Sequence, residues 1–343
     1  MSTRALWTSG GAAARPEVVL RDMFICDVFD ASPKSDLATM EHPMFSLSTR
    51  PDRKIRDYAH NGVAITVTPS VRGRATIYDK DIVIYCISQL MAALNAGRAI
   101  GRTLSLTAHD LLVATRRDTG GDSYARLREA FERLAGTRIT TNLAQDGQEI
   151  TRGFGLIENW EIIRKTRGGR MISVRVTLSE WLFRAVLTQS VLTLNRAYFD
   201  LRKPLERRVY ELARKHCGQQ REWRIALPLL HAKAGSDAPV RVFRAALRKM
   251  IAADGLPDYS LSEDPGDIIR VSRRTGLEAE GSVFEGPVFG ADCVEAVRVL
   301  APGWDAYALE AEWRAFWIQT GRQQLRAPQK AYLAWVAQRV ARG

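Results

Sequence analysis

Four basic side chains lie close together in the second half of the chain, and their chemistry suits them to bind a polyanion. They are Arg241, Arg244, Arg248 and Lys249. Residues three, four and seven apart share one face of an α-helix, so the three arginines point the same way, while Phe243, Leu247 and Met250 face the core. A guanidinium group binds phosphate or pairs with both acceptors of a guanine edge. No acidic residue occurs within residues 238–253, whereas solvated helix faces usually interleave acids. The pattern therefore favours contact with nucleic acid over a plain solvated face.

Two modules with a similar order of helices and strands contain such a helix. The second runs from Trp223 to Arg274 and contains a short helix, the basic helix and two strands. The first starts at Ser105, with helices LTAHDLLVAT and GDSYARLREAFERLAG before strands that begin RITTNL, FGLIENW and MISVRVTL. Two helices followed by strands closed by a glycine turn are typical of winged-helix domains, which place their second helix in the major groove. The sequence therefore predicts an α+β fold with two tandem winged-helix domains and a C-terminal helical segment.

The second helix of the first module also carries polar residues with a binding chemistry. Leucine and aromatic side chains at helical spacing predict its core face, which leaves Ser123, Arg126 and Arg133 pointing outward. Ser123 lies at the helix N-terminus, where a phosphate or a base edge is readily bound. Glu129 and Glu132 lie nearby, so ion pairing within the helix and contact with DNA both stay open for the two arginines.

A glycine turn of the first module forms a second basic feature. The stretch TRGGR at residues 166–170 holds Arg167 and Arg170 between two predicted strands. A basic loop at the tip of a hairpin can contact the phosphate backbone, as the wing of a winged helix does. We therefore expect both arginines to bind DNA phosphates.

The predicted helix at residues 204–217 holds further arginines, but acids accompany them. Arg207 and Arg208 are flanked by Glu206 and Glu211. Local salt bridges and contact with phosphate are therefore both open for these two arginines.

Composition and charge limit the classes of partner. The chain has 343 residues, a net charge of +12 and a sequence pI of about 9.8, which indicates polyanionic partners. The excess is local, because residues 200–250 hold 13 Lys and Arg against 5 Asp and Glu, whereas residues 1–60 hold 8 of each. The most apolar run, residues 82–96, is shorter than the roughly 20 residues of a membrane span, so it predicts a core helix and no membrane partner. The N-terminus has no pattern of a signal peptide, and we expect a cytoplasmic protein.

Neither a catalytic centre nor a cofactor site emerges from the motifs. The chain has no phosphate-binding loop of the form G-x-x-x-x-G-K-[ST], and its five histidines form no His-apolar-His metal pair. Its four cysteines form no C-x-x-C pair, so we expect reduced, packing residues and no metal. His216 and Cys217 are adjacent, but adjacent residues of a helix point about 100° apart. The sequence therefore predicts a protein that is not an enzyme and binds no cofactor.

Long ordered runs across residues 20–274 resemble one known family, the plasmid replication initiator protein A family of winged-helix initiators. Those runs are RDMFICDVFDASPKSDLATMEHPMFSL, IYDKDIVIYCISQLMAALNAGR, RLAGTRITTN, GFGLIENW, TLSEWLF, YFDLRKPLERRVYELARKHCG and GSDAPVRVFRAAL. The resemblance implies sequence-specific binding to repeated sites in double-stranded origin DNA and opening of the duplex. It also implies recruitment of a host replication initiator and the replicative helicase, and a homodimer as one form of the protein.

The chain divides by composition into a series of segments. The predicted division is a flexible tail and lead-in over residues 1–50, a first winged-helix domain over 51–200, a second over 201–274, a linker over 275–303 and a helical segment over 304–343. In the last segment, one aromatic stripe holds Trp313 and Trp317 and a second holds Tyr332 and Val336. These stripes favour packing against each other or against a winged domain, with docking of a replication protein as the alternative. A transcriptional repressor of its own gene or of a plasmid operon uses the same folds and charges, so it stays open beside the initiator. A DNA-processing enzyme also stays open as a third class, although the chain shows no active site for it.

Overall fold

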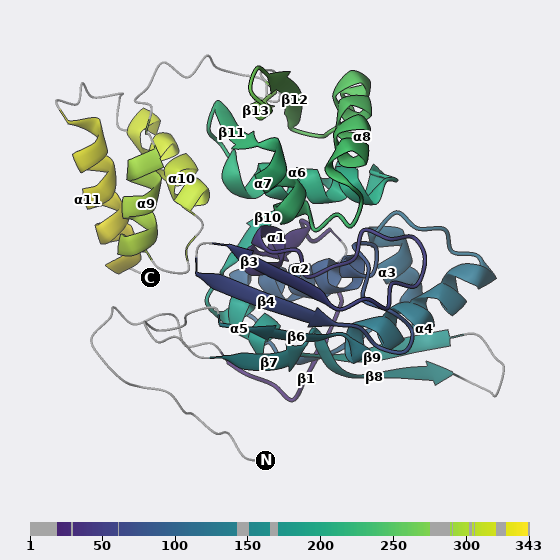
Figure 1. Ribbon diagram of the computed structural model, residues 1–343. Coiled ribbons are helices and arrows are strands. Elements are labelled where there is room, and N and C mark those ends of the chain that lie inside the picture. Colours follow the sequence, from purple (N-terminus) through teal and green to yellow (C-terminus); the bar gives the residue numbers. More distant parts are fainter. Residues whose placement is uncertain are drawn as a thin grey trace. The chain divides into compact units, whose positions relative to one another are not determined.

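The structure is a computed structural model, and it describes residues 19–28, 30–60, 62–142, 151–164, 171–274, 289, 291–301, 304, 306–319 and 327–341 (Figure 1). Two compact units divide the chain. The larger comprises residues 20–283, and the smaller comprises residues 284–343 with residues 1–19. The predicted tail over residues 1–18, most of the predicted linker and the predicted wing with Arg167 and Arg170 lie outside the described residues.

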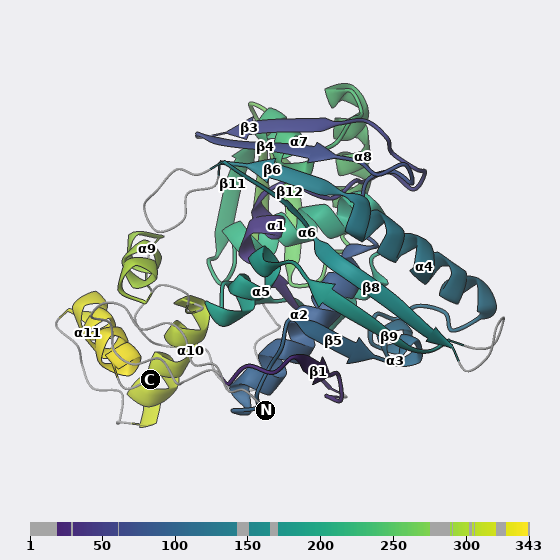
Figure 2. The ribbon, with the colours of Figure 1, turned by 90° about the horizontal axis from the view of Figure 1, so that it is seen from below.

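One set of elements in the larger unit surrounds a long buried helix. The set comprises α2 (Lys80–Asn95), β5 (Thr103–Leu106), α3 (Ala108–Ala114), α4 (Gly121–Gly136), β8 (Ile157–Arg164) and β9 (Met171–Leu178). Helix α2 is the predicted core helix, and it is buried nearly all around because its residues are apolar on every face. Strands β5, β9 and β8 form a sheet with β1 (Met23–Ile25) parallel to β5 at its edge. Helix α4 lies along β8 (Figure 2).

A second sheet is built from strands that the sequence assigns to other places. It has the order β3 (Arg56–His60), β4 (Val63–Thr68), β6 (Arg138–Thr141) and β7 (Arg152–Gly155). Strand β6 follows α4 directly, but it pairs with β4 instead of joining β8 and β9. The predicted module therefore carries an insertion that pairs with a hairpin from earlier in the chain.

The predicted lead-in is largely part of the fold. Strand β2 (Lys34–Asp36) pairs with β10 (Val191–Thr193), and α1 (Leu37–Glu41) packs on the later helix α6 (Pro204–His216). The Asp36 carboxylate accepts a hydrogen bond from the Thr39 backbone N–H and caps α1. The 3₁₀ helix η1 (Arg196–Asp200) and α5 (Glu180–Leu187) complete this part. The ordered lead-in thus begins before the expected boundary at residue 50, because its apolar side chains complete the core beside α6.

The second set of elements repeats the order of the first. It comprises α6 (Pro204–His216), β11 (Glu222–Ala226), α7 (Leu227–Ala234), α8 (Val240–Ala253), β12 (Tyr259–Asp264) and β13 (Ile268–Arg273). Both sets run helix, strand, helix, helix, strand, strand, and in both the first strand pairs with the last. Gly235 ends α7 in the left-handed region at φ 70°, and a Cβ there would lie 2.5 Å from the Cβ of Pro43. Glycine is therefore required at this turn.

Among its described residues, the smaller unit contains three helices around an aromatic core. They are α9 (Ala291–Leu300), α10 (Ala306–Gln319) and α11 (Pro328–Ala341). Trp313 and Trp317 of the first predicted stripe and Tyr332 and Val336 of the second are buried together, which supports mutual packing. Helix α9 lies inside the predicted linker, because its buried face joins this core. No helix in the described part of the chain has the length and apolarity needed to cross a bilayer.

Candidate nucleic-acid interface

Helix α8 presents an open face at the edge of the larger unit (Figure 1). It begins after Pro239, whose missing N–H costs nothing at a helix start, and it ends at Asp254 in the left-handed region. Phe243, Leu247 and Met250 are buried, and they anchor one face to the core as the sequence predicts. The remaining positions are exposed or half-buried, which leaves the opposite face free to meet a partner.

The four predicted basic residues of α8 fall into two pairs. Arg241 and Lys249 are exposed, and no acidic partner is found for either among the residues that the structure describes. Arg244 instead donates to Asp267 at 2.7 Å, and Arg248 donates through Nε and Nη2 to the two oxygens of Glu263 at 2.7 and 3.0 Å. Half of the positive charge on this face is therefore already paired in the free protein.

The paired acids belong to the β12–β13 hairpin, which sequence reasoning missed. The helix itself has no acids, but the stretch SEDPGD at residues 262–267 brings Glu263 and Asp267 back beside it. The Arg248 guanidinium lowers the pKa of Glu263, and Glu263 raises the pKa of Arg248. An acidic turn directly after a basic helix was the available signal, because in this fold order the hairpin packs against that helix.

Helix α4 occupies the corresponding position in the first set of elements, but its predicted face lies elsewhere. Leu127, Phe131 and Leu134 are buried as predicted. Ser123 is also buried, at 9% exposure, which corrects the expectation that it points outward. Arg133 donates to both oxygens of Asp79 at 2.7 and 2.8 Å, so it anchors α4 to the start of α2.

The polar side of α4 lines a cleft of about 590 Å³. The lining comes from the loop before β3, the start of α2, the α3–α4 connection, α4 itself and the segment leading into α6. Arg126 lines it together with Arg50 and Arg202, and all three are exposed, without an acidic partner within the described ranges. Ser123 and Arg133 also line it. The cleft therefore gathers three uncommitted guanidinium groups from distant parts of the chain.

Sequence reasoning singled out Arg126 but not the other two cleft arginines. Arg202 lies in the basic stretch over residues 200–250, whereas nothing around Arg50 marks it. A tertiary contact places Arg202, since the Tyr78 hydroxyl donates to its carbonyl. Arg50 is held by a local contact, in which its N–H donates to the Ser48 hydroxyl at 3.1 Å.

Arg207 and Arg208 are interior residues, which corrects their assignment to a DNA-binding surface. Each is 3% exposed. Arg207 donates to Asp81 of α2 at 2.6 Å, and Arg208 donates to the backbone carbonyls at the end of α1 and to Glu211. The salt-bridge interpretation of this helix is therefore the right one, although the partners come mainly from outside the helix.

These arginines belong to a buried ionic junction between α2 and α6. Lys80 is fully buried and donates to Glu211 at 2.8 Å, and the Tyr198 hydroxyl donates to the same oxygen at 2.9 Å. Burial lowers the pKa of Lys80. These buried ion pairs join the two sets, because Lys80 and Asp81 belong to α2 whereas Arg207 and Glu211 belong to α6. Helices α4 and α8 therefore belong to the same compact unit.

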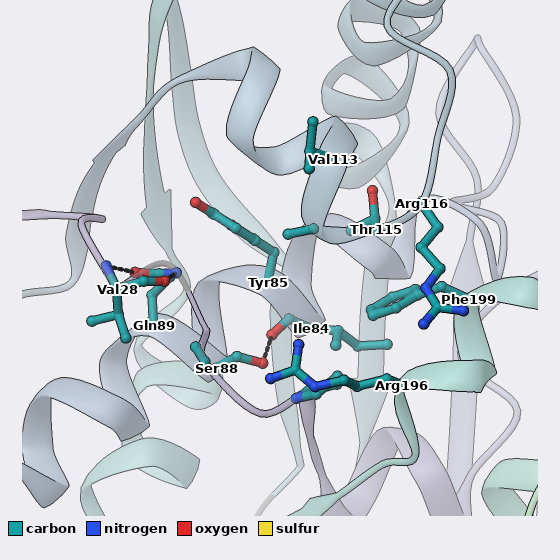
Figure 3. Close-up of a pocket in the computed structure, with 13 residues that line it drawn as sticks. Val28, Ile84, Tyr85, Ser88, Gln89, Val113, Thr115, Arg116, Arg196 and Phe199 are labelled. Atoms are coloured by element: carbon teal, nitrogen blue, oxygen red, sulfur yellow. Dashed lines mark hydrogen bonds between the residues drawn. The ribbon is translucent and has the colours of Figure 1, made fainter.

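A smaller pocket of about 210 Å³ lies beside α2 (Figure 3). Gln89 spans it by exchanging hydrogen bonds with the backbone of Val28 at 3.0 and 2.7 Å. The Ser88 hydroxyl donates to the carbonyl of Ile84 at 2.6 Å and accepts from the N–H of Lys34 at 2.8 Å. The side-chain amide of Gln89 and the hydroxyl of Ser88 are thus satisfied by the protein itself, which describes a packing gap better than a ligand site.

The adjacent His216 and Cys217 serve separate structural roles. His216 stacks on Trp223 at 4.7 Å between ring centroids and lies 2.8 Å from Glu41. The Cys217 thiol donates instead to the carbonyl of Gln220 at 3.3 Å. Burial raises the pKa of Cys217 to about 11, so the thiol stays protonated at neutral pH. All four cysteines are buried and free, as the sequence predicts.

Comparisons with known proteins point to DNA replication. Residues 34–261 match the replication initiator protein A family. A candidate replication protein of Wigglesworthia glossinidia brevipalpis is 36% identical over 260 residues, which cover 74% of this chain and 94% of that protein. The crystal structure of domains 2 and 3 of RctB matches with a TM-score of 0.50 and 14% identity, over 69% of this chain and 96% of that one. The last likeness shows a similar mixed α and β fold.

Proposed function

The chain belongs to the replication initiator protein A family, and we propose that it initiates plasmid replication by binding repeated origin sites sequence-specifically. In this proposal it promotes opening of the origin and recruits the host replication initiator and replicative helicase. The observation that carries the proposal is the open face of α8, with Arg241 and Lys249 exposed and unpaired within the described residues. Such a face suits a polyanionic duplex.

Each repeated set of elements acts as a winged-helix domain in this proposal. The order helix, strand, helix, helix, strand, strand supports it, with α4 and α8 as the second helices and the β12–β13 hairpin beside α8 as a wing. Helix α8 enters the major groove with its N-terminal half nearest the base edges. The pairs with Glu263 and Asp267 orient two arginines before DNA arrives, and phosphates can then replace the carboxylates.

The cleft beside α4 supplies a second contact. Arg50, Arg126 and Arg202 meet there without acidic partners in the described part of the chain, so they can hold backbone phosphates. Phosphate contacts fix the register of a protein on DNA but carry no sequence information. Because the ionic junction links the two sets, binding by one raises the effective concentration of the other at its site. We therefore assign specificity to α8 and non-specific affinity to the α4 cleft.

Several further parts of the proposal rest on the sequence and on family membership. We propose that the winged-helix domains extend over residues 51–200 and 201–274, with the ordered segments before residue 51 packed onto them, that Arg167 and Arg170 form a wing, and that the protein is not an enzyme. We also propose a homodimer as one form and the cytoplasm as its location. The compact unit over residues 20–283 accommodates both domains.

Footprinting tests the proposal. The full chain is bound to DNA from around its gene at physiological salt with an excess of non-specific competitor. We expect protection of tandem direct repeats spaced by whole helical turns, because an initiator gathers several copies at one origin. Protection of one inverted repeat over the promoter alone would instead identify a repressor. Absence of any protected site would overturn sequence-specific binding.

A further inference from the structure

The exposed face of α8 is not uniformly basic, because its N-terminal half carries apolar side chains. Val242 is 48% exposed, and Ala245 and Ala246 are exposed one turn later. Arg241 precedes them and Lys249 follows on the same side of the helix. Small apolar groups therefore lie between two unpaired cations. They occupy the part of the helix that the proposed function places nearest the base edges.

The corresponding part of α4 differs at these places. Residues 121–130 and 241–250 have the same sequence of buried and exposed positions, so their residues can be matched one to one. Asp122 corresponds to Val242, and Arg126 to Ala246. The same architecture thus tolerates charged side chains there, and packing does not require the apolar ones of α8. Val242, Ala245 and Ala246 lie exposed side by side between the two cations, where they can contact an apolar group of a bound partner.

We propose that Val242, Ala245 and Ala246 read the C5 methyl groups of thymines in the major groove, so that the recognised sites carry thymines opposite this strip. Thymine is the one DNA base that presents a methyl group in that groove, and apolar side chains are its natural contacts. Short side chains let the helix approach the bases closely, while Arg241 and Lys249 lie on either side of them and hold the helix in the groove. This inference rests on the proposed function and names the feature of the DNA that α8 selects.

Replacement of thymine by deoxyuridine tests the inference, because it removes the methyl group and keeps the base pair. The full chain is first used to select high-affinity duplexes from a random library. Each thymine of the selected site is then replaced singly, and the dissociation constant is measured. We expect a loss of about three- to fivefold at two or more thymines, from burial of one methyl group each, and no change at the others.

The isosteric variant Val242→Thr assigns the contact. It replaces one exposed methyl by a hydroxyl and so leaves the core intact. We expect it to weaken binding to the thymine duplex by a similar factor and to have little effect once the facing thymine is deoxyuridine, because the two changes remove the same contact. Val299→Thr is the matched control, since Val299 is an exposed helical valine, 75% exposed, in the smaller unit, and it should change neither value.

Failure of the thymine inference and failure of the proposed function give different results. If a site is selected but every deoxyuridine duplex binds as tightly as the original, the thymine inference is overturned while sequence-specific binding stands. The same holds if Val242→Thr weakens both duplexes equally. If the library yields no preferred site, the proposed function itself is contradicted.

Discussion

Helices α4 and α8 hold equivalent places in two sets of elements with the same order, yet they present different chemistry. In both helices the third, seventh and tenth matched positions are buried, as Leu127 and Leu247 illustrate at the seventh. Outside this shared core face, α4 carries acids and lines a cleft, whereas α8 has no acid and lies open. The comparison shows that the pattern of buried residues fixes the position of a helix, while its exposed residues determine what the helix can bind.

A buried ionic junction joins the two sets, and removing its central acid should have the largest effect. Glu211→Leu leaves Lys80 and Arg208 buried without a carboxylate and Tyr198 without its acceptor. We expect a loss of about 3 to 5 kcal/mol in the free energy of unfolding, which is typical of breaking a buried ion pair. Urea denaturation followed by circular dichroism measures it.

Glu206→Gln is the control on the same helix. It breaks the pair with Lys203, which lies at the surface with Lys203 69% exposed, and should cost no more than about 1 kcal/mol. Equal losses for the two variants would show that the junction does not hold the two sets together.

A buried histidine beside this junction makes stability depend on pH. Burial lowers the pKa of His42 to about 4 from 6.5, against the attraction of Glu41, and Arg208, Lys233 and Lys215 lower it further. Between pH 6.5 and 4 the unfolded chain binds a proton that the folded chain does not, so stability falls as the pH falls. The full contribution is about 3 kcal/mol.

His42→Leu removes that contribution. The free energy of unfolding is measured by urea titration at pH 7 and at pH 4. We expect it to fall between these pH values for both proteins, but by about 3 kcal/mol less for the variant than for the wild type. An unchanged difference between the two pH values would place the acid sensitivity in other groups.

The dependence of DNA binding on salt concentration tests the role assigned to the α4 cleft. Arg126→Ala removes one uncommitted guanidinium from the α4 cleft. We expect the slope of log binding constant against log salt concentration to shrink by about 0.9, the value for one lost phosphate contact, and the affinity to fall equally for selected and random duplexes. A loss confined to the selected duplex would assign base reading to α4 and reverse the comparison.

The smallest effect should come from the hairpin acids beside α8. Asp267→Asn frees Arg244 and removes a negative charge near the DNA, so binding should strengthen by a few tenths to about 1 kcal/mol at low salt. Asp254→Asn is the matched control, because Asp254 also pairs with an arginine, Arg274, but at the C-terminal end of α8. Weaker binding by Asp267→Asn would show that the carboxylate is needed to orient Arg244.

The sequence predicted those features that depend on local periodicity. It placed the core face of α8, the core helix α2 and the core face of α4, because apolar spacing alone sets these. It did not place the hairpin acids beside α8, although the acidic turn after that helix was a signal for them, and it could not place Arg50 in the cleft, since the cleft forms where distant segments meet. For the same reason it left Arg207 and Arg208 open, and only the packing of α2 and α1 against α6 shows that they are interior.

The most direct test of the account is the ratio of affinities for a selected duplex and a random duplex. It is measured at physiological salt for the wild type, for Arg126→Ala and for the double variant Arg241→Ala with Lys249→Ala. We predict that the double variant loses most of this ratio, because α8 can no longer settle in the groove, while Arg126→Ala keeps the ratio at lower affinity. A double variant that keeps the full ratio would contradict the assignment of specificity to α8.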